Sequence, residues 1–70
     1  MKTYDVTHEE YRVYMYKDGV ELEIEEPVTL FISESGSHRV LKKGGTVTYP
    51  RKDWVCVYWK PKDPSNPVKF

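Results

Sequence analysis

Few side chains in this sequence are suited to act as nucleophiles, bases or metal ligands. The chain holds one cysteine, Cys56, and two histidines, His8 and His38. Cys56 lies in the apolar run WVCVYW at residues 54–59, where a free thiol is usually a small packing residue. A zinc site needs four ligands at a recognisable spacing, which one cysteine and two distant histidines do not supply. We therefore expect no catalytic residue, no metal site and no cofactor.

Carboxylates are the next candidates for chemistry, because Glu21, Glu23 and Glu25 alternate along one segment. In a β-strand this spacing places all three on one face. Glycoside hydrolysis uses two carboxyl groups that face each other across a cleft, whereas these would form a ridge. The segment KKGGT at residues 42–46 lacks the spacing and the strand-to-helix context of a phosphate-binding loop. A solvated strand face is the favoured interpretation, and the sequence predicts that the protein is not an enzyme.

Length and composition set the scale of the fold that must position these groups. The chain has 70 residues, of which 39% are hydrophobic, and its aromatics are six Tyr, two Trp and two Phe. A domain of this size buries about 60% of the surface of its unfolded chain, so the core must be small. A single cysteine excludes an internal disulfide, and no run approaches the ~20 apolar residues of a membrane-spanning helix. We expect one complete, soluble domain in the reducing cytoplasm, without a membrane partner.

The clearest local pattern is YRVYMYKDGVELEIEE at residues 11–26, in which Asp18-Gly19 is a favoured pair for a two-residue type I′ hairpin turn. That turn pairs Tyr14 with Glu23. It predicts a core face with Val13, Met15, Val20, Leu22 and Ile24, and an outer face with Arg12, Tyr14, Tyr16, Glu21, Glu23 and Glu25. A helix that begins at a capping box in residues 7–10 is the alternative, although three Tyr and one Val favour a strand.

Short strands separated by turn residues continue along the chain. The expected elements are a strand at 28–33, a turn at 34–37, a hairpin of 38–41 with 46–49 around KKGG, and a last strand at 54–59. In that last strand, alternation places one set of side chains on the core and the other outside. The core set is Val55, Val57 and Trp59, and the outward set is Trp54, Cys56 and Tyr58.

These elements predict the fold class. We expect an all-β domain over residues 1–60, a small five- to six-stranded antiparallel barrel or sandwich, SH3-like or OB-like in style, built from two hairpins. Three prolines in residues 61–70 predict an extended or disordered tail. Docking of that tail through Val68 and Phe70, on the domain or on a partner, is the alternative.

Charge is divided unevenly along a chain whose net charge is zero. Residues 1–37 hold three basic and nine acidic side chains, a net charge of −6, and residues 38–70 hold eight basic and two acidic side chains, a net charge of +6. Opposite charges of this kind orient two surfaces as they meet. Pairing of the halves within the fold, or between copies in a homo-oligomer, is therefore expected.

The favoured functional hypothesis is a binding module for a protein partner, acting as a stoichiometric inhibitor or accessory factor. Tyrosine and tryptophan are frequent interface anchors, so the predicted outward aromatics form the apolar part of the contact surface. Charged residues around them orient the partner. The predicted site consists of Tyr14, Tyr16, Trp54 and Tyr58, with Glu21, Glu23, Arg39, Lys42, Lys43, Arg51 and Lys52.

Two alternatives remain open at this stage. The basic residues lie near Tyr49, Trp54 and Tyr58 in the sequence, and basic grooves with aromatic platforms suit single-stranded nucleic acid. A net charge of zero argues against that interpretation, because nucleic-acid-binding domains are usually strongly basic. The second alternative is a self-associating structural protein.

Overall fold

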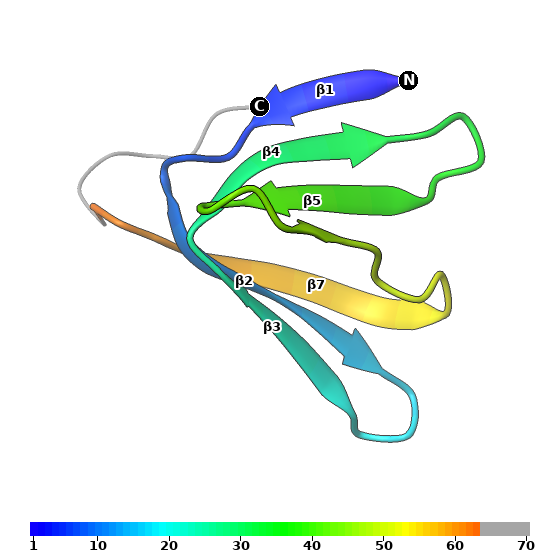
Figure 1. The fold of residues 1–70 in the computed structure, drawn as a ribbon. Coiled ribbons are helices and arrows are strands. Elements are labelled where there is room, and N and C mark those ends of the chain that lie inside the picture. The colour runs from blue at the N-terminus through cyan, green and yellow to red at the C-terminus, as the bar shows by residue number, and fades with distance from the viewer. Residues whose placement is uncertain (64–70) are drawn as a thin grey trace.

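The computed structural model describes residues 1–63, and this part of the chain contains seven strands (Figure 1). They are β1 (Lys2–Asp5), β2 (Glu9–Tyr16), β3 (Glu21–Glu25), β4 (Pro27–Ile32), β5 (His38–Lys42), β6 (Val47–Thr48) and β7 (Trp54–Pro61). All pairings are antiparallel, and they form a four-stranded sheet, β1-β4-β5-β6, and a three-stranded sheet, β3-β2-β7. The all-β prediction is confirmed. These strands do not close into a barrel.

The core lies between the inner faces of the two sheets. The chain passes between the sheets where β1 leads into β2 and where β3 leads into β4, on the side where the sheets converge in Figure 1. It passes between them again where β6 leads into β7, on the opposite side. Apolar side chains from both sheets meet in the core, including Tyr14 and Ile24 from the three-stranded sheet and Leu30 and Val40 from the four-stranded sheet. The two sheets thus share one small core.

Three-residue loops close the three hairpins within residues 1–63. Between β2 and β3, the Tyr16 amide donates to the Val20 carbonyl (2.9 Å) and the Gly19 amide donates to the Tyr16 carbonyl (3.0 Å). Equivalent bonds close the β4–β5 and β5–β6 loops. Each loop has three residues and ends in a glycine with positive φ, as three-residue hairpin loops require. The φ values are 86° for Gly19, 87° for Gly36 and 93° for Gly45.

The first predicted hairpin is present, but its predicted register is wrong by one residue. Tyr14 pairs with Leu22 rather than with Glu23, because the loop has three residues instead of two. In the three-residue loop only Gly19 needs positive φ, whereas a type I′ turn would also force Asp18 into that region. A one-residue slip exchanges the two faces of a strand pair.

The exchange of faces overturns the assignment of core and surface in this hairpin. The inward set is Arg12, Tyr14, Tyr16, Leu22 and Ile24, and Val13 and Met15 instead share the outer face with the three glutamates. Val20, predicted in the core, is 51% exposed. Tyr14 and Tyr16 bring large apolar area to the inner face, and Val13 is also buried, at 2% exposure, although it lies on the outer face.

Three β-bulges also alter the pattern of alternation. The extra residues are Glu10 in β2, Val28 in β4 and Val55 in β7, each unmatched in the register of the neighbouring strand. A bulge makes residues three apart point to the same side. In β7 it turns Trp54 inward and leaves Val55 62% exposed, so the predicted orientations of these two residues are wrong.

Beyond its bulge, β7 follows the predicted alternation. Val57 and Trp59 face the other sheet, and Tyr58 faces outward. Cys56 also faces outward and is exposed, so the expectation that its thiol packs in the fold is wrong. β7 continues to Pro61, and the predicted tail from residue 64 onward, with Val68 and Phe70, lies outside the described residues. Residues 1–63 include no helix with the length and apolar character to cross a membrane.

Candidate functional site

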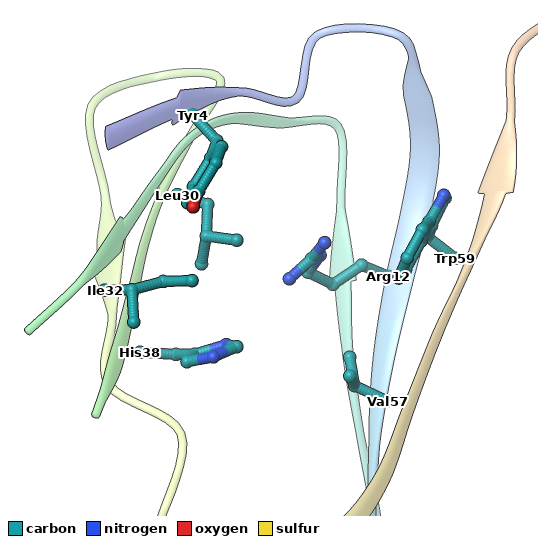
Figure 2. Close-up of a pocket in the computed structure, with 7 residues that line it drawn as sticks. All are labelled: Tyr4, Arg12, Leu30, Ile32, His38, Val57 and Trp59. Atoms are coloured by element: carbon teal, nitrogen blue, oxygen red, sulfur yellow. The ribbon is translucent and has the colours of Figure 1, made fainter. Parts of the chain in front are cut away.

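A cleft of about 240 Å³ lies between the inner faces of the two sheets (Figure 2). Its walls are apolar side chains from both sheets, and two polar side chains, Arg12 and His38, reach into it. Small-molecule sites in proteins usually combine apolar walls with a few converging polar groups. The apolar lining residues are Tyr4, Leu30 and Ile32 on one side and Val57 and Trp59 on the other.

A buried ion pair anchors the polar part of the cleft. Arg12 Nε donates to Glu9 Oε1 and Nη2 donates to Oε2, both at 2.9 Å, and neither side chain is more than 2% exposed. The bulge at Glu10 is what brings these two residues, three apart in sequence, to the same face. Burial alone would lower the pKa of Arg12, but the hydrogen bonds to Glu9 and Tyr14 outweigh it and raise that pKa. The guanidinium is therefore always charged and always paired.

The network continues across the gap between the sheets. Arg12 Nη1 donates to the Tyr14 hydroxyl (3.1 Å), whose oxygen lies 2.7 Å from His38 Nδ1. In the tautomer whose Nδ1 accepts the Tyr14 proton, neutral His38 carries its own proton on Nε2. Burial and the charge of Arg12 lower the pKa of His38, and burial raises the pKa of Tyr14. Both side chains are accordingly neutral near pH 7.

Aromatic rings enclose this network. The Trp54 ring lies 5.7 Å from the Tyr14 ring and 5.2 Å from the His38 ring, and Arg12 Cζ lies 5.2 Å from the Trp59 ring centre. The predicted contact surface has four aromatic side chains, and three of them pack within the fold instead. Tyr14 and Tyr16 are only 0% and 6% exposed, and Trp54 is half-buried against the core, which corrects their predicted outward orientation.

Tyr58 is the predicted contact aromatic that does face outward, at 41% exposure. Its neighbour across β2 is Glu23 of β3, through the cross-strand row Glu23, Val13 and Tyr58. Partial burial raises the pKa of the Tyr58 phenol, and the nearby charges of Glu21 and Glu23 add to that rise. The structure thus brings Glu21, Glu23 and Tyr58 together on one acidic face of the three-stranded sheet.

The predicted basic residues lie elsewhere and are spread over several elements. Arg39 and Lys42 belong to β5, Lys43 to the loop after it, and Arg51 and Lys52 to the loop before β7. Several of them already have partners. Arg39 Cζ lies 5.4 Å from the Tyr49 ring centre, Lys43 Nζ lies 3.8 Å from Glu26, and Arg51 pairs with Asp53 at 3.2 Å and packs over Tyr16 at 4.5 Å. Lys43–Glu26 and Lys60–Glu10 join the acidic and basic halves within the fold.

Sheet edges are the other candidate feature, and they differ in chemistry. Edge strands of natural proteins usually carry charges, bulges or short lengths that prevent further pairing. β1 contains Lys2 and Asp5, β6 has two residues, and β3 carries three glutamates. β7 has eight residues, none charged from Trp54 to Trp59, with a bulge at Val55 near its start, and within residues 1–63 only one of its edges is paired.

Sequence reasoning missed the buried network of Glu9, Arg12 and His38. The alternation of Arg12, Tyr14 and Tyr16 was visible, and all three end in hydrogen-bonding groups, but the assumed turn placed that face outside. No sequence signal marks the bulge at Glu10, which is needed to bring Glu9 onto the same face. Within residues 1–63, no three His, Cys, Asp or Glu side chains are arranged to hold a metal ion. Comparisons with protein-family models, curated proteins and solved structures gave no match.

Proposed function

We propose that this protein acts by binding another protein, which adds an extended segment to the open edge of β7. The observation that carries the proposal is the contrast between β7 and the other edge strands: β7 is long, uncharged through its centre and paired on one side only within residues 1–63. Backbone groups on such an edge are ready to pair with a further strand, a common mode of peptide recognition.

The side chains beside this edge favour the same interaction. Val55 is 62% exposed, Cys56 is exposed and Tyr58 is 41% exposed, and all three lie on the outer face of β7. Side chains of an added strand would pack directly against them, since cross-strand neighbours lie about 5 Å apart. Val13 lies on the same face but in the central strand, and its neighbours leave it only 2% exposed. The exposed apolar surface of this face is therefore concentrated at the edge.

The charges that flank β7 indicate what kind of segment fits. Lys52 precedes the strand beside Asp53, which pairs with Arg51 at 3.2 Å, and Lys62 and Asp63 follow it; all of them are exposed. A partner segment with an apolar centre and acidic residues at its ends would match this pattern. Antiparallel pairing of two complete β7 strands, with Trp54 opposite Pro61, would place Lys52 opposite Asp63 and Asp53 opposite Lys62, so these charges do not separate a second copy from another protein.

Nucleic-acid binding has less support. Trp54, which would serve as a stacking platform, packs against the core. Tyr58 is outward but lies near Glu21 and Glu23, whose charges repel phosphate. The predicted basic residues do not share the Tyr58 face. In the proposed function the chain works by binding alone.

Selection from a library of displayed random peptides tests this proposal. We expect enrichment of proline-free peptides with alternating apolar residues and acidic ends. Tyr58→Lys places a charge at the centre of the β7 edge and should lower the affinity for the enriched peptides by about tenfold or more. The matched variant Tyr49→Lys alters a tyrosine that is 66% exposed outside β7 and should leave affinity unchanged. An equal loss of peptide affinity in both variants, or no loss in Tyr58→Lys, would contradict binding at β7. If the protein instead forms a concentration-dependent dimer that Tyr58→Lys abolishes, the segment that pairs with β7 belongs to a second copy.

A further inference from the structure

The cleft between the sheets has the size and walls of a small-molecule site. An apolar cavity of about 150 Å³ holds a benzene molecule, and this cleft has about 240 Å³. Leu30 and Ile32 line one wall, and Val57 and Trp59 line the other, with ring and aliphatic surface facing each other. Space of this size and shape suits a flat molecule of two fused rings.

The polar groups at the cleft present hydrogen-bond donors. Arg12 has five N–H groups, of which three donate to Glu9 and Tyr14. The guanidinium points into the space between the sheets (Figure 2), and its two other N–H groups make no hydrogen bond to the described residues. In the tautomer whose Nδ1 accepts from Tyr14, His38 adds an Nε2–H donor. Glu9 and Tyr14, which supply the acceptors of the network, do not line the cleft.

Charge balance restricts the ligand further. The positive charge of Arg12 is already matched by Glu9, with two hydrogen bonds of 2.9 Å. An anionic ligand would bring an uncompensated charge into an apolar site, and removing that charge from water is costly. A neutral carbonyl group would satisfy the available donors without that cost.

We propose that this cleft binds a small, uncharged, flat apolar molecule whose carbonyl oxygen accepts hydrogen bonds from Arg12 and His38. Ile32, His38 and Trp59, which line the cleft, are only partly buried, so part of its lining reaches the surface. The cleft lies on the opposite face of β7 from Tyr58, so this inference is independent of the proposed protein partner.

Three matched probes test the chemistry: indane, 1-indanone and indane-1-carboxylate share a bicyclic frame and differ in acceptor and charge. Binding is followed by methyl ¹H–¹³C NMR spectra of Leu30, Ile32 and Val57. We expect 1-indanone to shift all three sets of methyl signals and to bind at least about tenfold tighter than the other two probes. Equal affinity for indane would contradict the role of the donors, and tighter binding of the carboxylate would contradict the argument from charge.

A pair of variants locates the binding. Ile32→Phe fills the cleft and should lower the affinity for 1-indanone by about tenfold or more. Val47→Phe adds the same ring on the outer face of the same sheet and should have no effect; Val47 is 40% exposed. Folding of both variants is checked by the dispersion of their NMR spectra. Binding of 1-indanone that is unchanged in folded Ile32→Phe, or absent in the unaltered protein up to the solubility of the probe, would overturn the proposal.

Discussion

The hydroxyl oxygen of Tyr14, on β2, lies 2.7 Å from Nδ1 of His38, on β5, and this hydrogen bond links the three-stranded sheet to the four-stranded sheet. The same hydroxyl accepts a hydrogen bond from Arg12, which is paired with Glu9. A chain of buried polar contacts therefore crosses a core that is otherwise apolar. Such a network stabilises one arrangement of the two sheets only if each member keeps its partners.

Removing the Tyr14 hydroxyl tests the link between the sheets. Tyr14→Phe leaves a buried N–H of Arg12 without its acceptor, and we expect the free energy of unfolding to fall by about 1–3 kcal/mol. Urea unfolding monitored by circular dichroism gives this quantity. Tyr49→Phe, at a residue that is 66% exposed, is the control and should change stability by less than about 0.5 kcal/mol. Equal stability of the two variants would show that the Tyr14 hydroxyl contributes nothing.

Titration of His38 should make stability depend on pH. The folded state lowers the pKa of His38 below its ordinary value of 6.5, so the unfolded chain binds a proton more readily. Its contribution is thus fully present above pH 6.5 and is lost as the pH falls toward the folded-state pKa. We expect the free energy of unfolding to decline as the pH falls below about 6.5.

A glutamine variant separates His38 from the other titrating groups. His38→Gln keeps an acceptor for the Tyr14 hydroxyl but cannot titrate, so the decline with pH should become shallower. An unchanged slope in His38→Gln would assign the pH dependence to other residues.

Removing one member of the Glu9–Arg12 ion pair should lower the free energy of unfolding more than replacing both members with apolar residues. Either Glu9→Met or Arg12→Met leaves a buried charge without its partner, which we expect to cost about 3–5 kcal/mol. The double variant removes both charges together and should lose less than the sum of the two single losses. Thermal and urea unfolding of the four proteins complete the cycle, and additive losses would contradict a direct interaction.

Gly19 should be required for the register of the first hairpin. Its φ of 86° is unfavourable for residues with a side chain, while the space around an added Cβ is open. Gly19→Ala should therefore destabilise the fold by about 1–2 kcal/mol through backbone strain alone. Gly19→Asn should lose less stability, because asparagine tolerates positive φ better than alanine does. Identical stability of the two variants would indicate that the loop adopts another conformation.

Sequence predicted the positions of most strands and turns, but not which way their side chains point. Asp18-Gly19 marked the turn correctly, yet the added loop residue reversed the faces of β2 and β3. At Val55, a bulge with no sequence signal turned Trp54 inward, while Tyr58, beyond the bulge, followed the predicted alternation. β1 was missed because its four residues, KTYD, have no apolar alternation. Local propensity thus placed the elements, and tertiary packing decided the register.

Those orientations also explain the outcome for the predicted site. Tyr14 and Tyr16 were assigned to the surface through the register, so both moved to the core together. Glu21 and Glu23 remained exposed, because charged side chains on this strand favour solvent in either register. The buried pairing of Glu9 with Arg12 depends on the bulge at Glu10, and hydrophobic periodicity carries no information about such a contact.

Amide hydrogen exchange along β7, measured by NMR with and without a peptide enriched by display, tests the proposed binding edge most directly. An added strand would pair with the β7 amides that face away from β2. These amides should exchange at least about tenfold more slowly in the complex, and the effect should disappear in Tyr58→Lys. Protection confined to the four-stranded sheet, with β7 unchanged, would contradict strand addition at this edge.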